Sequence, residues 1–424
     1  MRYYSTRDKK TEFTFSQAVL NGLAQDGGLF VPQEIPQYPA SVLKSLGSMS
    51  FLDIAFETIR PFVKGVIPDS VLQDIVHSAY TFDVPLVNVG KRFVLELFHG
   101  PTAAFKDFGA RFMSRTFSYL RRGENKALKI LVATSGDTGG AVADGFFGVE
   151  GITVTVLYPK GRVSPLQERQ IAGLGGNISA IAVEGSFDDC QKLVKEAFGN
   201  ADLKKRLDMS SANSINIARL IPQAIYYTAA SAKIEGGIVA CVPSGNLGNL
   251  TAGMYAQKMG APIVQFIAAS NINKTFPDYL ESAVYNPCSS QATISNAMDV
   301  GAPSNFERMA SHWSIDQMRQ ILLGAFVTDS ETKDTISTVY KTTAYVLDPH
   351  GAVGWKAADI LEKKCAVKNA PIVVLETAHP AKFAEVVEPL AGAVPLPESL
   401  KNAMQRKIIS KTISADFNEL SALL

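Results

Sequence analysis

The amino-acid sequence predicts an α/β fold in which mainly parallel strands alternate with crossover helices. Short runs of almost entirely apolar residues recur after residue 85, and such runs are typical of strands that are buried on both faces. Between these runs lie longer stretches with helical periodicity, at 187–197 and 215–232. The expected strands are 128–133, 152–157, 178–183, 238–242, 263–268 and 371–375.

Composition and charge limit the classes of function. A chain of 424 residues, 46% hydrophobic and 19% charged, indicates a globular protein of more than one domain. The formal net charge is only +1, so we expect no nucleic-acid partner, and any anionic ligand needs a local site. The four cysteines and five histidines show no metal-ligand spacing, so no metal is expected. Without a secretory signal or a long apolar segment, no membrane association is expected, and we expect a cytoplasmic protein.

Two segments share the plan of strand, glycine-bearing polar loop and helix, with the loops at 134–140 and 243–249. In an open α/β sheet such loops lie at the carboxyl ends of strands, where helix N-termini attract anions. In the second loop, Gly245 and Gly248 allow close backbone approach to a phosphate, and the polar side chains at 244, 246 and 249 add donors. Each loop alone is also compatible with an ordinary tight turn. Together they indicate two anionic groups.

A single lysine stands out between two phenylalanines. Lys106 lies between Phe105 and Phe108, with glycine and proline shortly before. An amine that is desolvated by such neighbours has a lowered pKa, as an imine-forming or proton-shuttling group requires. A solvated surface lysine gives the same local pattern, and spacing alone does not separate the two interpretations.

Ordered motifs throughout the chain resemble the threonine synthase family of the fold-type II pyridoxal-phosphate enzymes, in its longer bacterial and fungal branch. Three motifs carry the resemblance: His-Gly-Pro-Thr-Ala-Ala-Phe-Lys-Asp at 99–107, Thr-Ser-Gly-Asp-Thr-Gly at 134–139 and Pro-Ser-Gly-Asn-Leu-Gly-Asn at 243–249. Further blocks match at 26–30, 164–167, 213–216, 295–299 and 376–383.

The resemblance implies a specific architecture. We expect two open, twisted, mainly parallel sheets flanked by helices, together with an N-terminal module at 1–85. The cofactor-binding unit would span 86–390, with its smaller lobe at roughly 107–230. Residues 391–424 would form a C-terminal tail packed on that unit.

The resemblance also implies how pyridoxal 5′-phosphate is held. Lys106 would form the imine to the cofactor and later move protons on the substrate. Thr377 would hydrogen-bond the pyridine nitrogen, and Asp137 would lie near the 3′-oxygen, where many relatives carry asparagine. The cofactor phosphate would be bound by Gly245, Asn246, Leu247, Gly248 and Asn249.

Two further groups of residues are implied for the substrate. Ser135, Gly136 and Thr138 would receive its carboxylate. Its phosphate would be bound by Ser214, Asn216 and Arg219. For the arginine a surface ion pair is the alternative. Weaker candidates for the phosphate are Lys160 and Arg162, and two histidines, His99 and His350, would line or support the pocket.

The implied reaction converts O-phospho-L-homoserine and water to L-threonine and phosphate, which makes the protein a carbon–oxygen lyase acting on phosphates. The motifs leave three alternatives open. One is a phospho-lyase that releases 2-oxobutyrate and ammonia, the second is a non-catalytic cofactor- or phosphate-binding protein, and the third is cysteine synthase-type chemistry. A monomer or a homodimer is expected.

Overall fold

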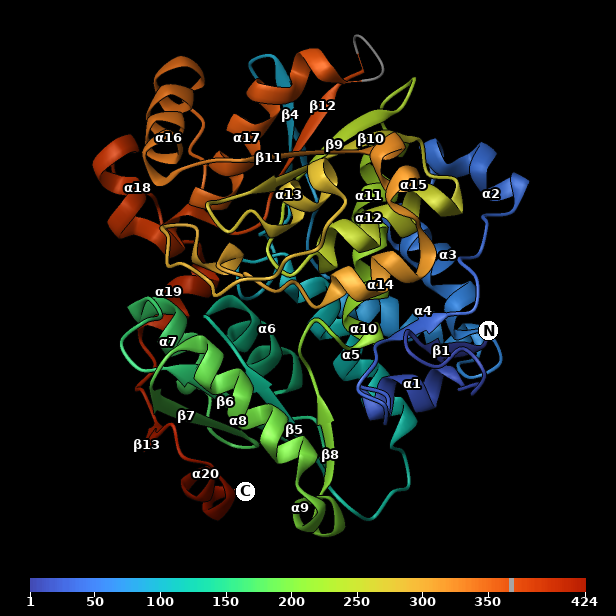
Figure 1. Ribbon diagram of the computed structural model, residues 1–424, viewed down its shortest axis with the longest axis vertical. Helices are drawn as coiled ribbons and strands as arrows, with labels where there is room; N and C mark the ends of the chain where they lie inside the picture. The colour runs from blue at the N-terminus through green and yellow to red at the C-terminus, as the bar shows by residue number, and fades with distance from the viewer. Residues whose placement is uncertain (366–369) are drawn as a thin grey trace.

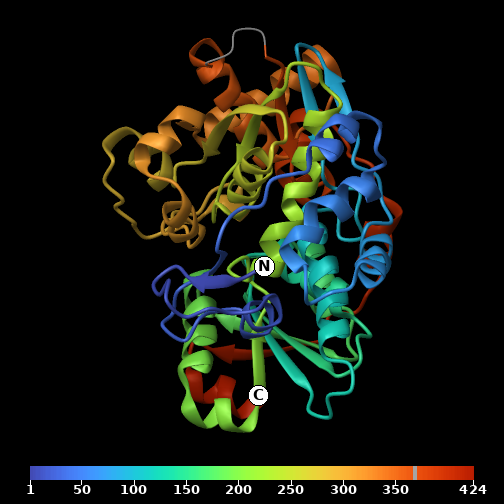
Figure 2. The same cartoon turned by 90° about the vertical axis from the view of Figure 1, so that its right-hand side faces the viewer.

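The computed structural model describes residues 1–365 and 370–424, which form two open β-sheets with helices on both faces (Figures 1 and 2). The larger sheet has the strand order β11-β10-β9-β12-β4-β3, and the smaller sheet has the order β13-β7-β6-β5-β8. All neighbouring strands of these two sheets are parallel except the pair β3 and β4. The α/β fold with mainly parallel sheets is therefore confirmed.

The larger sheet brings together segments from the start, middle and end of the chain. Its strand β12 lies between β9 and β4, so a late strand joins two earlier ones. Helix α17 (Pro349–Leu361) packs along β9 to β12. The strands are β3 (Leu86–Val89), β4 (Arg92–Glu96), β9 (Ile238–Pro243), β10 (Ile263–Ser270), β11 (Leu322–Phe326) and β12 (Ile372–Glu376).

The smaller sheet ends in a strand from the C-terminal tail. Strand β13 (Ser410–Ser414) pairs in parallel with β7, and α20 (Phe417–Leu423) packs against α8. Four of the five residues of β13 are exposed, and this polar segment gives no apolar run from which a strand could be predicted. The other elements of this lobe are β5 (Leu128–Ala133), β6 (Ile152–Pro159), β7 (Ile178–Glu184), β8 (Asp208–Ser211), α6 (Asp137–Phe146), α7 (Pro165–Ala172), α8 (Phe187–Gly199) and α9 (Ala201–Arg206).

The N-terminal segment, blue in Figures 1 and 2, lies against the helices between the two sheets. It contains a short antiparallel pair, which the sequence did not reveal, and several helices that pack on α5, α10 and α11. One buried apolar cluster runs from these helices into both sheets, so the segment shares its core with the rest of the chain. Its elements are β1 (Tyr3–Ser5), β2 (Phe30–Pro32), α1 (Phe15–Asn21), α2 (Ala40–Ser45), η1 (Leu46–Ser48), α3 (Phe51–Val63) and α4 (Asp69–Ala79).

The six predicted strands are present, with ends that differ from the prediction by at most two residues, but one predicted helix is divided. The helix expected at 215–232 consists of α10 (Ile217–Leu220), η2 (Ile221–Gln223) and α11 (Ala224–Ala232). Pro222 has no N–H to donate, which interrupts the helical hydrogen bonds at this point. The side-chain amide of Gln223 donates to the carbonyl of Arg219 at 2.7 Å and so adds a hydrogen bond at this interruption.

The remaining helices complete both lobes. In the described ranges, no helix combines the length and the apolar character needed to cross a membrane. The remaining helices are α5 (Lys106–Leu120), α12 (Gly248–Met259), α13 (Thr275–Ser282), η3 (Asn296–Met298), α14 (Asn305–His312), α15 (Ile315–Ile321), α16 (Asp329–Thr343), η4 (Glu362–Lys364), η5 (Pro380–Phe383), α18 (Ala384–Ala391) and α19 (Glu398–Met404).

A buried arginine ties the N-terminal segment to the larger lobe, and its replacement tests this attachment. Arg308 donates to the carbonyl of Phe30 at 3.1 and 3.0 Å and to that of Ile215 at 2.8 Å. R308M leaves both carbonyls without these donors, so we expect the chain to lose about 2–4 kcal/mol of stability. Thermal unfolding and chymotrypsin cleavage within residues 1–85 measure the effect.

Arg319 provides a matched control. It also donates to backbone carbonyls, those of Leu280 and Glu281, but none of them belongs to the N-terminal segment. R319M should leave cleavage within residues 1–85 at the unmodified level. Equal cleavage of the two variants would contradict the attachment by Arg308.

Candidate active site

A cavity of about 990 Å³ lies at the carboxyl ends of β5, β9 and β12, between the two lobes. Most residues singled out from the sequence line it, although they come from distant parts of the chain. Asp137, Gly136 and Asn216 are not among the lining residues. The predicted residues that line it are Lys106, Ser135, Thr138, Ser214, Arg219, Gly245, Asn246, Leu247, Gly248, Asn249 and Thr377.

Backbone pairing brings Lys106 close to Thr377. Ala104 and Ala378 form an antiparallel bridge, and the N–H of Phe105 donates to the carbonyl of Thr377 at 2.9 Å. Lys106 follows directly as the first residue of α5, while Thr377 directly follows β12. Both side chains therefore line the same cavity.

The amine of Lys106 is largely removed from water. Its side chain is 13% exposed, and its Nζ lies 3.8 Å from Oδ2 of Asp137. Burial lowers the pKa of Lys106 to about 8, an effect that Asp137 opposes and that the charges of Lys382 and Arg219 reinforce. Roughly a tenth of these amines is uncharged at pH 7, which suits a nucleophile or a base.

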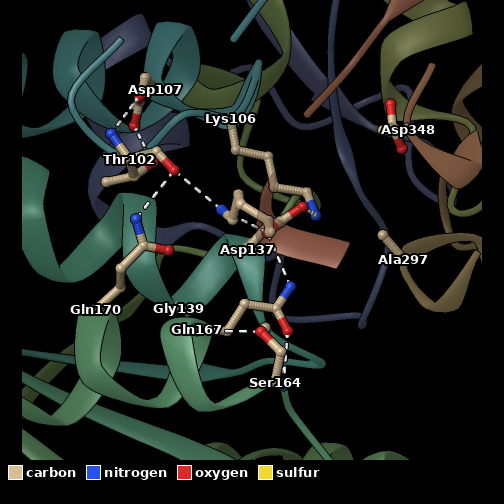
Figure 3. A network of polar contacts seen from close by, with 12 residues as sticks. Thr102, Lys106, Asp107, Asp137, Gly139, Ser164, Gln167, Gln170, Ala297 and Asp348 are labelled. Carbon is tan, nitrogen blue, oxygen red and sulfur yellow. Dashed lines mark hydrogen bonds and ion pairs between the residues drawn. The ribbon is translucent and has the colours of Figure 1, made fainter. Parts of the chain in front are cut away.

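Asp137 belongs to a buried polar network that the sequence reasoning missed (Figure 3). Its Oδ1 accepts from Nζ of Lys382 at 2.7 Å and from Nε2 of Gln167 at 3.0 Å. Burial disfavours the carboxylate, but the ammonium groups of Lys382 and Lys106 outweigh it and lower the pKa of Asp137. Gln167 and Lys382 both lie in motifs that match the family. That match was the one available signal, because a lysine gives no sign of burial in sequence.

The loop at 244–249 lines the cavity and carries one side-chain amide without a partner. Leu247 has a left-handed φ of 59°, and α12 begins at Gly248. The Oδ1 of Asn249 accepts from the hydroxyls of Tyr226 and Tyr227 at 2.6 and 2.8 Å. Its Nδ2 is buried without a partner, so it can donate to an anion in the cavity.

Two other polar side chains of this loop hold its shape. Nδ2 of Asn246 donates to Oγ of Ser214 at 2.7 Å, and Oγ of Ser244 donates to the carbonyl of Val242 at 2.9 Å. A Cβ on Gly245 would lie 2.8 Å from the carbonyl oxygen of Ala297. The loop is therefore packed tightly against residues 297–298, and only glycine fits at 245 without a shift.

Arg219 supplies a buried cation without a carboxylate partner. It is 2% exposed, its Nη1 donates to the carbonyl of Ala212 at 2.6 Å, and its Nε has no partner. Burial lowers the pKa of Arg219 to about 10, so the guanidinium stays charged at neutral pH. Within residues 1–365 and 370–424 no carboxylate forms an ion pair with it. Such a group favours an anionic ligand.

Asn216 lies behind the cavity and does not face it. Its Nδ2 donates to the carbonyls of Val19 and Ser211 at 2.9 and 3.1 Å, and its Oδ1 caps α10 at the N–H of Ala218. Asn213, which had no assigned role, lines the cavity beside Ser214. The direction of side chains along an irregular turn cannot be read from the sequence, so the sequence did not reveal that Asn216 faces away from the cavity and Asn213 towards it.

The loop at 134–140 presents the N-terminus of α6 to the cavity. Oγ1 of Thr134 accepts from the N–H groups of Gly136 and Gly139 at 2.9 and 2.8 Å, which fixes the turn. Gly136 has a φ of 140°, and a Cβ there would lie 2.5 Å from Gln167. Ser135 and Thr138 line the cavity on either side of this glycine. Hydroxyl and N–H donors at a helix N-terminus suit a carboxylate.

The weaker candidates from the sequence differ in their position relative to the cavity. His350 lines the cavity, with its Nδ1 2.5 Å from Asp348 and its Nε2 accepting from the N–H of Ala297 at 3.2 Å. His99 instead contacts Glu96 at 2.7 Å and does not line the cavity. The basic residues Lys160 and Arg162 are exposed and also lie outside the lining.

Comparison with known proteins places this cavity in a family. Residues 2–80 match the family model for the threonine synthase N terminus, 87–378 that of pyridoxal-phosphate dependent enzymes, and 351–423 that of the threonine synthase C-terminal region. Threonine synthase of Haemophilus influenzae is 42% identical over 100% of this chain and 99% of its own. The chain belongs to the threonine synthase family.

Solved structures of family members have the same fold. Threonine synthase of Escherichia coli superimposes with a TM-score of 0.92 at 39% identity, covering 100% of this chain and 99% of that one. A pyridoxal-phosphate-bound threonine synthase of Brucella melitensis gives 0.91 at 38%, covering 100% and 98%. The family assignment makes the chain a pyridoxal-phosphate dependent enzyme, and the unpartnered donors around the 244–249 loop are compatible with that cofactor.

The position of Asn216 leads to a stability prediction. N216A removes the α10 cap and leaves two buried carbonyls without this donor, so we expect a loss of roughly 2–4 kcal/mol. Urea unfolding measures it. The control N200A removes only the cap of α9 and should cost about 1 kcal/mol. A tenfold rise in KM for the substrate with unchanged stability would place Asn216 in the binding site after all.

Proposed function

We propose that this chain catalyses the conversion of O-phospho-L-homoserine and water to L-threonine and phosphate, as a carbon–oxygen lyase acting on phosphates. The observation that carries the proposal is one cavity with a buried, partly deprotonated lysine and two separate anion-binding regions. The first region is the 244–249 loop, and the second surrounds Arg219.

The residues of the cavity fit pyridoxal phosphate. The loop N–H groups and Nδ2 of Asn249 would hold the phosphate, Lys106 would bond the aldehyde carbon, and Thr377 would face the ring nitrogen. When bound, the cofactor conjugates the substrate amine with an electron-poor ring and makes the neighbouring C–H bond acidic.

Lys106 is the proposed proton carrier of the reaction. Its ε-amine, with a pKa of about 8, can take a proton from Cα, release it and then take a proton from Cβ of the substrate. Protons are returned later to Cγ and to Cα. A long flexible side chain at the start of α5 can reach two neighbouring carbons from one anchor. Loss of the phosphate from Cγ and addition of water at Cβ then complete the balance of atoms.

The two ends of the substrate would be bound by different elements. The α6 N-terminus, with Ser135 and Thr138, would bind the carboxylate, and Arg219 with Ser214 would bind the phosphate. Ser214 also accepts the hydrogen bond from Asn246 of the cofactor-phosphate loop. This contact supports two adjacent phosphate sites at a fixed separation, which orients the substrate before any proton moves.

A monomer or a homodimer is the proposed oligomeric state. A cytoplasmic location stays a prediction from the sequence.

The decisive experiment identifies the product. The purified protein, loaded with pyridoxal phosphate, should convert O-phospho-L-homoserine to L-threonine with release of one phosphate. K106A should lose this activity and the yellow absorbance of the cofactor imine. 2-Oxobutyrate as the main product would replace the proposal with the phospho-lyase alternative, and no turnover would favour a binding protein.

Arg219 gives a second test, directed at the substrate phosphate. R219M removes a charge-assisted contact, so we expect kcat/KM for O-phospho-L-homoserine to fall by about 100-fold. Inhibition by inorganic phosphate should weaken in parallel, while the affinity for the cofactor changes little. The control R162M alters an exposed arginine outside the cavity and should keep both constants. Equal losses in the two variants would contradict the role of Arg219.

A further inference from the structure

A second lysine, Lys382, is buried beside the cavity. Its side chain is 0% exposed, and its Nζ lies 2.7 Å from Oδ1 of Asp137 and 2.9 Å from the carbonyl oxygen of Thr102. A fully buried ammonium is stable only beside a compensating charge and hydrogen-bond acceptors. Both are present here.

The acceptors of Lys382 are themselves fixed. The N–H and Oγ1 of Thr102 donate to the two carboxylate oxygens of Asp107 at 2.9 and 2.5 Å. Nε2 of Gln170 donates to the carbonyl of Thr102 at 3.0 Å. Asp107 directly follows Lys106 in α5, so the network returns to the residue from which the chemistry is proposed to start.

The network divides the two oxygens of Asp137 between different tasks. Oδ1 accepts from both Lys382 and Gln167, whereas Oδ2 faces Lys106 at 3.8 Å. One carboxylate oxygen is thus occupied by a permanent partner, and the other is directed at the reactive amine.

We propose that Lys382 is a positioning residue that serves as the permanent counter-ion of Asp137, so that Lys106 is free to exist as an uncharged amine. Without Lys382, the single cation beside the buried carboxylate would be Lys106 itself, and the ion pair would hold its proton. The proposal rests on the proposed role of Lys106 as the amine that bonds the cofactor.

The charges around Lys106 agree with this role. The charged groups that act on it are Asp137 of α6, Lys382 of η5 and Arg219 of α10. Asp137 raises the pKa of Lys106, and the two cations lower it. Burial lowers the pKa of His379, next to η5, to about 4, so this histidine adds no charge at neutral pH.

The same arrangement determines the hydrogen bond to the cofactor. An ionised Asp137 can only accept, so a 3′-oxygen held beside it would have to carry the proton of their hydrogen bond. An asparagine at position 137 could donate instead. A buried aspartate therefore needs the counter-ion that Lys382 supplies, whereas a neutral asparagine would need none.

The test measures how fast Lys106 bonds the cofactor at different pH values. Full-length protein freed of its cofactor is mixed with pyridoxal phosphate, and the growth of the yellow absorbance is followed. The pH midpoint of this rate reports deprotonation of Lys106. In K382Q, which keeps a donor but removes the charge, we expect the midpoint to rise by about one pH unit or more. At pH 7 the rate should then fall about tenfold.

Three variants separate charge from structure. K382R keeps the charge and should stay within about half a unit of the wild type. Q167M removes the other, neutral donor to Oδ1 and should also leave the midpoint unchanged. On a D137N background, K382Q should raise the midpoint less than it does with Asp137 present, because no buried carboxylate remains to hold the proton of Lys106 and only the direct effect of the Lys382 charge is lost.

Each outcome bears on one hypothesis. If the wild type never turns yellow, the proposed role of Lys106 fails. If the wild type turns yellow and K382Q keeps its midpoint, or shifts it equally on the D137N background, Lys382 has a structural role alone and the inference is overturned. If K382Q does not fold, D137N alone decides: its midpoint should fall below that of the wild type, and an unchanged value refutes an ionised Asp137.

Discussion

The short antiparallel bridge between Ala104 and Ala378 is the contact on which the geometry of the site depends. It joins the segment before α5 to the segment after β12, which are far apart in the sequence. Hydrogen bonds between backbone groups fix this pairing, so the backbone on both sides of the bridge is held in place. Lys106 and Thr377 take their directions from this bridge, and η5 with Lys382 begins only two residues beyond it.

Charge is distributed unevenly between the interior and the surface. Over the whole chain, positive and negative residues nearly cancel. Around one cavity, however, lie Arg219, Lys106 and Lys382. Among the described residues, Asp137 forms ion pairs with the two lysines, and no carboxylate forms one with Arg219. An excess of buried cations is costly in an empty site and is relieved when anions enter. The two phosphates and the carboxylate of the proposed cofactor and substrate would supply such anions.

The sequence predicted the fold well where periodicity or motifs carry the signal, and poorly where tertiary contacts decide. Six buried strands and the two glycine loops were predicted because apolar runs and glycines are visible in one dimension. The edge strand β13 was missed because its pairing with β7 depends on backbone groups, while its side chains are polar and exposed. Asn216 and Lys382 show the same limit in the site: burial and side-chain direction arise from packing between segments that sequence order does not reveal.

The strand order has a consequence for how the chain is made. Strand β12 lies between β9 and β4, and β13 completes the other sheet, so each sheet waits for residues near the end of the chain. During translation the early strands of the larger sheet leave the ribosome with unpaired edges, which are prone to aggregate. The cofactor pocket includes Thr377, directly after β12, and it is therefore complete only when the chain is almost fully synthesised.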